Sequence, residues 1–359
     1  MNLYPLQFEP LYKEKIWGGN KIKNYFNKNT ATEKTGESWE IAAHHNGNSI
    51  VSQGKLAGKT LSEIYSNFKT KLMGNLIKVK NYEKFPLLLK ILDASDKLSV
   101  QVHPPNDYAL KIEAEPGKTE MWYIIEAKPE AQLVFGLKEG TSRKTMKKAI
   151  KNGTLEKHLN RVQVTAGDVF FIPSGTIHAL EEGILLAEIQ QNSDTTYRVY
   201  DWNRKGKDGN PRELHIEKAL EVTNFTNKNT NLNYQLTCKE DSYQQIILAA
   251  CPHFVTEKII CKQSYNISPN QQRFYTLMFL EGKGNLNWNG QQYHIKKGDS
   301  FLLPACLNKV QINGKLTFLK SYLPDSKQYV LNKLKNKGFS NNEIKKLPGI
   351  KKWETEKLF

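Results

Sequence analysis

Two polar side chains stand two residues apart in the apolar segment that runs from Leu98 to His103. The segment predicts a β-strand, and because side chains alternate across a strand, Gln101 and His103 project from the same face. An amide oxygen beside an imidazole is half of a metal site. Further along the chain, Glu120 and His178 are the residues that would complete such a site. The metal hypothesis therefore requires a fold that brings these four side chains together.

Each candidate ligand also has an ordinary interpretation when it is taken alone. His103 is then a core histidine and Glu120 a surface carboxylate. The neighbouring histidines His44 and His45 suggest a second metal site, but adjacent residues of a strand face opposite ways, so we favour polar loop residues there.

Length and composition set the broad class. The 359 residues are enough for about two domains, and a 39% hydrophobic content is enough to form cores. The net charge of +16 is compatible with a nucleic-acid partner, an anionic membrane surface or a small anionic substrate. No nucleic-acid-binding motif is present, and lysine richness beside asparagine richness is typical of codon bias. We therefore expect neither a nucleic-acid nor a membrane partner.

The compartment is predicted from cysteines and from the N-terminal segment. The few cysteines are irregularly spaced and form no C-x-x-C pair, which is typical of a reducing compartment. The residues after Met1 have neither a charged region nor a long apolar region, so no signal peptide is predicted. No run of about 18 apolar residues is present either. We expect a soluble, cytoplasmic protein.

An internal repeat indicates the domain organisation. Gly167-Asp-Val-Phe-Phe-Ile-Pro173 and Gly298-Asp-Ser-Phe-Leu-Leu-Pro304 share one pattern of turn, apolar strand and terminating proline. The first copy continues to His178, whereas the second has Lys309 at the equivalent place. This predicts two similar β-barrels, of which one binds a metal. We expect a metal-binding domain at residues 1–232, a metal-free domain at 233–324 and a Lys-rich helical tail at 325–359.

Local patterns predict several elements. Residues 60–68 have helical spacing, with Thr60 as the cap and Glu63 completing a capping box. Residues 85–92 are a short apolar run typical of a buried strand, with Lys90 in its middle. Lys90 either points into a polar cavity or reaches water from a sheet edge, and the sequence favours neither. Residues 142–159 and 212–225 predict helical insertions.

The motifs together resemble a known family. Gly-x5-Pro-x-Gly-x2-His, matched fully by residues 167–178, is the second signature of the cupin superfamily. Together with Gln101-x-His103, the segment 119–122 and the segment 191–201, it makes the chain similar to type I mannose-6-phosphate isomerases in their short bacterial form. The resemblance extends from Leu3 to about Pro324. It implies a mainly β fold of two cupin barrels with helical insertions, followed by a short helical C-terminal tail.

The resemblance also implies a cofactor and a reaction. The family binds one Zn²⁺ per chain, here through Gln101, His103, Glu120 and His178, and two imidazoles with a carboxylate suit this ion. The implied reaction interconverts mannose 6-phosphate and fructose 6-phosphate through a cis-enediol. The partner is then a small sugar phosphate, and the protein is expected to be a monomer or a homodimer.

Further site residues follow from matching positions in the family. Arg198 and Arg204 are implied for the charge of the phosphate and the enediolate, and arginine suits this task because its planar fork binds two oxygens at once. Lys90 and Lys118 match lysines that line the family's pocket, and Asp194 matches an acidic residue. Lys118 and Asp194 are both open as the group that transfers the proton.

One position departs from the family pattern, and alternatives exist for one residue and for the function. Some longer relatives have a histidine where this chain has Gly117, so no histidine acts there. A surface strand charge is the alternative for Arg198. At the level of function, the alternatives are a non-catalytic sugar-phosphate sensor on the same scaffold and a metal-dependent cupin oxygenase. The complete set of ligands and cations disfavours both.

Overall fold

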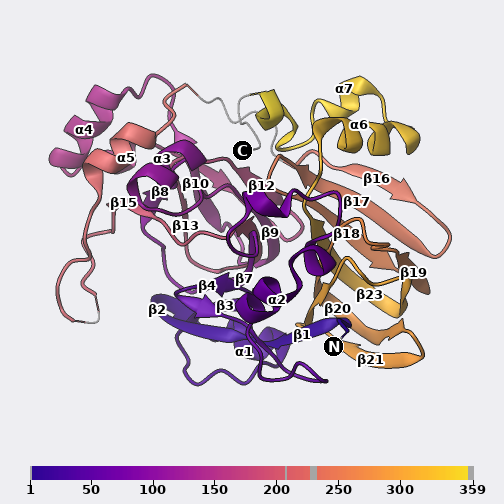
Figure 1. Ribbon diagram of the computed structural model, residues 1–359. Coiled ribbons are helices and arrows are strands. Elements are labelled where there is room, and N and C mark those ends of the chain that lie inside the picture. Colours follow the sequence, from indigo (N-terminus) through magenta and orange to yellow (C-terminus); the bar gives the residue numbers. More distant parts are fainter. Residues whose placement is uncertain (1, 207, 227–232, 355–359) are drawn as a thin grey trace. The chain divides into compact units, whose positions relative to one another are not determined.

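The computed structural model describes residues 2–206, 208–226 and 233–354 (Figure 1). The chain divides into two units. The first consists of residues 1–11, 39–89 and 233–359, and the second of residues 12–38 and 90–232. No helix within the described ranges is long and apolar enough to cross a membrane.

The first unit contains one large sheet with the strand order β16-β17-β18-β23-β20-β22-β1-β6, in which β19 pairs with β23 and β21 with β20. Its strands are β1 (Leu6–Glu9), β6 (Ile50–Val51), β16 (Leu236–Lys239), β17 (Tyr243–Ala250), β18 (Val255–Cys261), β19 (Ser264–Ile267), β20 (Tyr275–Trp288), β21 (Gln291–Lys296), β22 (Ser300–Leu303) and β23 (Val310–Tyr322). A hairpin of β4 (Ala43–His44) and β5 (Gly47–Asn48) lies apart from it. The helices are α2 (Leu61–Met73), α6 (Lys327–Asn336), α7 (Asn341–Ile344) and short 3-10 turns at Val79–Asn81 and Ile350–Glu354.

The second unit is built on two sheets, which we name after one strand of each. The β8 sheet has the order β11-β10-β13-β8-β15 and the β9 sheet the order β12-β9-β14-β7-β3-β2. The strands are β2 (Leu11–Gly19), β3 (Thr35–Ile41), β7 (Leu87–Ala94), β8 (Val100–Val102), β9 (Glu120–Ala127), β10 (Gln132–Leu137), β11 (Leu159–Gln163), β12 (Val169–Ile172), β13 (His178–Leu180), β14 (Ile184–Gln191) and β15 (Tyr197–Tyr200). Residue 11 of β2, residues 39–41 of β3 and residues 87–89 of β7 are counted with the first unit. The helices are α1 (Lys21–Phe26), α3 (Asn106–Ile112), α4 (Arg143–Lys151), α5 (Ile216–Val222) and a 3-10 turn at Leu155–His158.

The repeat predicted from the sequence is present in the strand order. Taken from its other edge, the β9 sheet has the order β2-β3-β7-β14-β9-β12. The first, second, third, sixth, fourth and fifth strands along the chain are neighbours in this order, and the same holds for β16-β17-β18-β23-β20-β22 of the large sheet. The two repeated turns are alike in detail. Gly167 and Gly298 both have positive φ angles, +95° and +89°, which glycine adopts without a steric penalty.

The hydrogen bonds of the two turns also correspond. Asp168 accepts a hydrogen bond from the backbone of Thr165 at 2.8 Å, and Asp299 accepts one from Lys296 at 2.9 Å. The glycine N–H groups donate to carbonyls of the neighbouring strands, β9 and β20. The mainly β fold is thus confirmed, and the same six-strand path occurs twice.

Apolar side chains decide which faces of the β8 sheet are covered. One face contributes Leu133, Phe135 and Leu180 to a core shared with residues of the β9 sheet such as Trp122 and Phe170. The other face packs against helices α4 and α5, which lie beside it in Figure 1. Polar side chains that point to the first face therefore enter the space between the two sheets of this unit.

Several local predictions are confirmed and one helix differs. Thr60 and Glu63 form the predicted capping box at the start of α2. The predicted helix at 212–225 is present only as α5, which begins at Ile216. The four residues before it run beside β15 instead, where the N–H of His215 donates to the carbonyl of Arg198 at 2.8 Å. A tertiary contact thus replaces the first turn of the predicted helix.

The tail and the N-terminal segments belong to the first unit. Val330, Leu334 and Ile344 of helices α6 and α7 are buried with side chains of β16, β17 and β18. Residues 1–11 and 39–89, which the sequence analysis placed with the metal-binding domain, group with residues 233–359. The reason is strand pairing, because β1 pairs with β22 and with β6.

Candidate active site and metal centre

A single row of side chains crosses three neighbouring strands of the β8 sheet. His178 on β13 is paired with Gln101 on β8, and Gln101 is paired with Arg198 on β15. Residues directly opposite one another in antiparallel strands share a face. Phe135, the partner of His178 on β10, is part of the core between the sheets. The row therefore faces the space between the two sheets.

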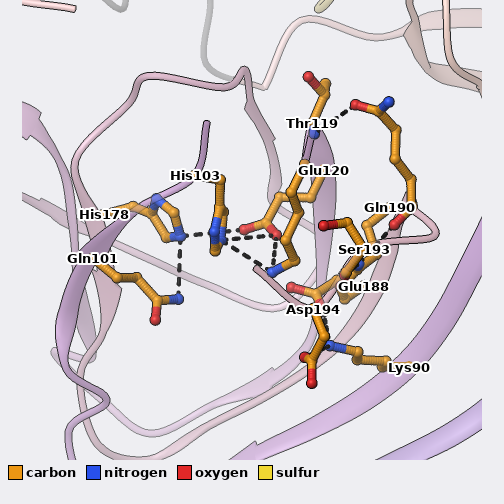
Figure 2. A network of polar contacts seen from close by, with 12 residues as sticks. Lys90, Gln101, His103, Thr119, Glu120, His178, Glu188, Gln190, Ser193 and Asp194 are labelled. Atoms are coloured by element: carbon orange, nitrogen blue, oxygen red, sulfur yellow. Dashed lines mark hydrogen bonds and ion pairs between the residues drawn. The ribbon is translucent and has the colours of Figure 1, made fainter. Parts of the chain in front are cut away.

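The predicted metal ligands come together in this space, as Figure 2 shows. His178 Nε2 lies 3.3 Å from Glu120 Oε1, and His103 Nε2 lies 3.5 Å from Glu120 Oε2. One donor atom from each of these residues lies within 4.8 Å of the other two. The amide of Gln101 lies beside them, with its Nε2 3.3 Å from His178 Nε2. All four predicted ligands thus contribute to one cluster.

The two imidazoles are oriented by backbone carbonyls. Nδ1 of His103 lies 2.9 Å from the carbonyl of Thr195, and Nδ1 of His178 lies 2.9 Å from that of Thr176. A proton on Nδ1 leaves Nε2 with a free lone pair, which is the form that binds a metal. Burial, assisted by the charge of Lys118, holds the pKa of His103 well below its usual value. Burial lowers the pKa of His178 to about 4.

Glu120 has few partners for a buried carboxylate. Its side chain is fully buried, and its Oε1 accepts no hydrogen bond in the described part of the chain. The nearest cation is Lys118, whose Nζ lies 2.8 Å from Glu120 Oε2 and 3.0 Å from His103 Nε2. Burial raises the pKa of the Glu120 carboxyl to about 8. A buried carboxylate is costly unless a cation compensates it.

These observations fit a metal ion. Two neutral imidazoles, a buried carboxylate with one oxygen unpartnered among the described residues and an amide that can turn its oxygen inward are the donors of a zinc-type site. An ammonium group, that of Lys118, already contacts two of the donors, which shows that the cluster attracts positive charge.

Lys90 enters the same region from β7. Its side chain is only 4% exposed, so the alternative of a lysine that reaches water from a sheet edge is excluded. Its Nζ lies 3.4 Å from Glu188 Oε2 and 3.9 Å from carboxylate oxygens of both Glu37 and Asp194. Burial opposes its charge, but Glu188, Glu37 and Asp194 hold the pKa of Lys90 above its usual range.

Glu188 is a site residue that the sequence analysis missed. It lies on β14 with its side chain 3% exposed, and Trp122 Nε1 donates to its Oε1 at 2.8 Å. Despite burial, Lys118 and Lys90 hold the pKa of Glu188 below its usual value. The signal was present in the sequence, since Glu188 interrupts an apolar strand just as Lys90 does.

Arg198 is anchored on one side. Its Nη1 donates to the carbonyl of Glu213 at 2.9 Å, while its Nε is buried and has no hydrogen-bond partner among the described residues. Burial and the neighbouring charge of Arg212 lower the pKa of Arg198. An arginine with an unused buried N–H is suited to bind an anion. This position does not fit the alternative of a solvated strand charge.

Arg204 and Asp194 lie in different surroundings from Arg198. Arg204 Nη2 donates to Asp201 at 2.8 Å and its Nη1 to Asp96 at 3.2 Å. Asp194 is one-third exposed and lies beside Lys90. If Arg204 binds substrate as predicted, its guanidinium does so while it also binds the carboxylates of Asp201 and Asp96.

The histidine pair of the first unit differs from the expectation in its geometry. His44 ends β4 and His45 belongs to the following turn, so strand alternation does not separate them. Their ring centroids lie 4.1 Å apart. The N–H of Asn46 donates to Nδ1 of His44 at 3.1 Å, which is a typical turn contact.

Comparisons with known proteins agree with the site. Residues 5–153 match the family model described as phosphomannose isomerase type I, catalytic domain, and residues 247–323 match the mannose-6-phosphate isomerase cupin domain. The chain is 39% identical over 325 residues to the probable mannose-6-phosphate isomerase GmuF of Bacillus subtilis, covering 89% of this chain and 99% of that protein. It is also 39% identical to a mannose-6-phosphate isomerase of Streptococcus mutans, covering 89% of this chain and 98% of that protein.

A solved structure shows the same fold. The crystal structure of the mannose 6-phosphate isomerase from Bacillus subtilis matches with a TM-score of 0.83 at 34% identity, covering 89% of this chain and 100% of that one. Each relative is covered almost completely, so about a tenth of this chain has no counterpart in them. Sequence, fold and ligand cluster lead to one conclusion: this chain belongs to the family of type I mannose-6-phosphate isomerases.

Proposed function

We propose that this protein is a zinc-dependent aldose–ketose isomerase that interconverts mannose 6-phosphate and fructose 6-phosphate through a cis-enediol. The observation that carries this proposal is the row in which His178, Gln101 and Arg198 occupy neighbouring strands. This row places the cluster of candidate metal ligands beside the guanidinium of Arg198, whose Nε has no hydrogen-bond partner among the described residues. Isomerisation requires these two properties, a polarised carbonyl and stabilisation of negative charge.

The metal would be held by His103, Glu120 and His178, with the amide of Gln101 as a weaker fourth ligand. Zinc bound there supplies Lewis acidity to the carbonyl and hydroxyl oxygens of the sugar. The chain itself provides the rest. Thr195 and Thr176 carbonyls keep both imidazoles in the ligating tautomer, and the buried position of Glu120 strengthens its attraction for a cation.

We assign the negative charge that develops on the enediolate to Arg198, whose unused Nε lies on the ligand row. A guanidinium fixed before the reaction needs no reorganisation, which is the source of its advantage over water. Lys90 remains a predicted contributor to substrate binding. Its surroundings favour an indirect contribution, since it contacts Glu188 and Asp194 at the border of the site.

For the proton transfer between C2 and C1 we favour Lys118 over Asp194. Lys118 lies within 3.0 Å of atoms of two ligands, His103 and Glu120, whereas Asp194 lies next to Lys90. A group that moves a proton must be within hydrogen-bond reach of the reacting carbons. Lys118→Met and Asp194→Asn separate the two roles, because only the variant of the transferring group abolishes exchange of the C2 proton with solvent.

The first test is coupled conversion of mannose 6-phosphate to fructose 6-phosphate, before and after chelation and after readdition of zinc. We expect activity to be lost with the chelator and restored by zinc. A zinc-loaded protein that binds mannose 6-phosphate without converting it would instead be a sugar-phosphate sensor. A protein that neither binds nor converts it would overturn the proposal.

A further inference from the structure

The segment that contains Lys118 lies just before a strand. Glu120 is the first residue of β9, and the sheet holds it on both sides, since it is paired with Ile172 of β12 and with Gln190 of β14. Lys118 stands two residues earlier, outside the strand. Its ammonium group nevertheless contacts Glu120 and His103 of the ligand cluster. The position of Lys118 therefore depends on contacts other than strand pairing.

Two side-chain amides provide such contacts. Oε1 of Gln191 accepts a hydrogen bond from the buried backbone N–H of Thr119 at 2.9 Å. Nε2 of Gln191 donates to Oδ1 of Asn106 at 3.0 Å, and the same oxygen accepts the backbone N–H of Gly117 at 2.9 Å. The residues directly before and after Lys118 thus donate their N–H groups to one linked pair of amides. We name the pair of Asn106 and Gln191 the amide clamp.

The two amides have one orientation that satisfies these contacts. A backbone N–H can only donate, so the atoms that face Thr119 and Gly117 have to be amide oxygens. The nitrogen of Gln191 then faces Asn106, whose oxygen accepts its second hydrogen bond. The backbone of residues 117–119 thus fixes the direction of the link between the two amides, and a change in either amide disturbs that backbone.

The loop before helix α3 packs closely against the same segment. A Cβ atom at Gly117 would lie 2.6 Å from the backbone nitrogen of Asn106 and 2.9 Å from the carbonyl oxygen of Pro104, closer than such atoms approach in folded proteins. The N–H of Lys118 donates to that carbonyl at 3.2 Å. Pro104 directly follows the candidate ligand His103. The clamp therefore joins the segment that carries Lys118 to the segment that carries His103.

We propose that Asn106 and Gln191 are positioning residues, whose amide clamp holds Lys118 Nζ at the ligand cluster for the proton transfer between C2 and C1 of the sugar. This inference rests on the proposed function, which assigns that transfer to Lys118. The proton that leaves one carbon is delivered to the other, so the step consumes no co-reactant. Because strand pairing holds Glu120 independently, loss of the clamp slows catalysis without releasing zinc. The competing interpretation is a pair of amides that only stabilises the two loops.

The test uses variants of the full-length zinc-loaded protein that preserve side-chain shape. Gln191→Met removes both hydrogen bonds and leaves the buried N–H of Thr119 without this acceptor. Asn106→Asp and Gln191→Glu each add one negative charge above about pH 8, where the introduced carboxyl groups are ionised. They differ in hydrogen bonding. Asn106→Asp still accepts both N–H groups, whereas Gln191→Glu sets two oxygen atoms against each other.

The matched control is Asn160→Leu. It removes an amide that donates to the carbonyl of Phe135 at 3.1 Å, on strand β11 at the edge of the β8 sheet. The readouts are kcat and KM for mannose 6-phosphate, zinc content, the thermal unfolding temperature and the kinetic isotope effect of deuterium at C2. The control variant should keep the kinetic constants, the isotope effect and the zinc content of the wild type.

We expect Gln191→Met and Gln191→Glu to lower kcat by about 10- to 100-fold, with KM and zinc content changed much less. Asn106→Asp should stay close to the wild type, because its contacts are preserved. An effect of charge alone would instead be equal in Asn106→Asp and Gln191→Glu. The isotope effect on kcat should be at least as large in the slow variants as in the wild type, since proton transfer is the step that the clamp supports.

A further readout does not depend on turnover. The clamp protects the N–H groups of Gly117 and Thr119 from exchange with solvent. Hydrogen–deuterium exchange of a peptide that contains residues 117–119 should therefore be faster in Gln191→Met than in the wild type. The same peptide should exchange at the wild-type rate in Asn160→Leu.

Three outcomes would overturn the inference. They are equal kcat values in Asn106→Asp and Gln191→Glu, unchanged exchange of residues 117–119 in Gln191→Met, and a lower unfolding temperature with kcat retained, which indicates a purely structural pair. If Gln191→Met does not fold, the comparison of Asn106→Asp with Gln191→Glu still decides. Wild-type protein that does not isomerise mannose 6-phosphate would refute the proposed function instead, and the exchange measurement then decides whether the clamp holds residues 117–119.

Discussion

Lys90 and Glu188 form a buried ion pair, with 3.4 Å between Nζ and Oε2, and the other unit contains its counterpart with the charges exchanged. There, Glu257 on β18 and Lys320 on β23 lie 2.7 Å apart. The strands correspond in the repeated path, since β7 and β14 take the places of β18 and β23. Two copies of one strand arrangement thus hold a buried ion pair of opposite polarity.

The register supports this equivalence. Glu188 is opposite Trp122, which is itself opposite Phe170 of the first repeated motif. Lys320 is opposite Leu277, which is opposite Phe301 of the second motif. In the first copy the pair borders the ligand cluster. In the second copy Lys333 of α6 binds Glu257 at 2.7 Å.

Glu188→Gln should lower kcat by roughly 10²- to 10³-fold, because it removes a fixed negative charge beside the reacting groups while preserving side-chain volume. Trp122 can still donate to the amide oxygen. Turnover and zinc content are to be measured together, and zinc should stay at the wild-type level. Glu181→Gln, which removes a mostly buried carboxylate paired with Arg161, is the control. Equal kcat in both variants would exclude a role for Glu188.

Arg198→Ala should cut turnover by about 10²- to 10³-fold with normal zinc content, since the donor for the developing negative charge is lost. Arg198→Lys should recover only a fraction, because a lysine cannot form the planar two-nitrogen contact. Steady-state kinetics and metal analysis decide the matter. An active Arg198→Ala protein would show that the assignment of the arginine is wrong.

Glu120→Gln should reduce bound zinc from one per chain towards none, because the charged ligand of the cluster is replaced by a weakly coordinating amide. The measurement is metal content after dialysis, with thermal unfolding in the presence and absence of zinc as a second readout. Zinc should stabilise the wild type and leave the variant unaffected. Glu126→Gln, on the same strand but paired with Lys21 away from the cluster, should behave as wild type.

Glu257 is expected to make the first unit sensitive to acid. Burial opposes its ionisation, but Lys320 and Lys333 hold the pKa of the Glu257 carboxyl well below its usual value. A folded pKa below the unfolded one stabilises the protein above about pH 4.3, and this stabilisation is lost as the pH falls through the folded value.

The corresponding variant is Glu257→Gln. It leaves two lysines without their buried counterion, which should cost about 3–5 kcal/mol of unfolding free energy at pH 7. Urea unfolding followed between pH 7 and pH 3 tests this, and the difference from wild type should shrink below about pH 4. A difference independent of pH would contradict the assigned cause.

Some features were determined by the sequence alone because short-range physics produces them. The two-residue spacing of Gln101 and His103 turns both side chains to one side, although β8 ends at Val102 and His103 lies just beyond it. The capping box of Thr60 and Glu63 needs only four consecutive residues, and the repeated turns at Gly167 and Gly298 need only a positive φ beside an aspartate. These predictions are confirmed, as is the gathering of His103, Glu120 and His178.

Other features were decided by tertiary structure, because they depend on strand register and on partners far apart in the chain. The sequence placed Lys90 in an apolar strand, but only the pairing of β7 with β14 shows that Glu188 is its counterion. Pairing of β1 with β22 likewise groups the N-terminal residues with the unit that contains residues 233–359. Arg204 and Arg212 both bind the carboxylate of Asp201, and only the folded chain brings these three side chains together.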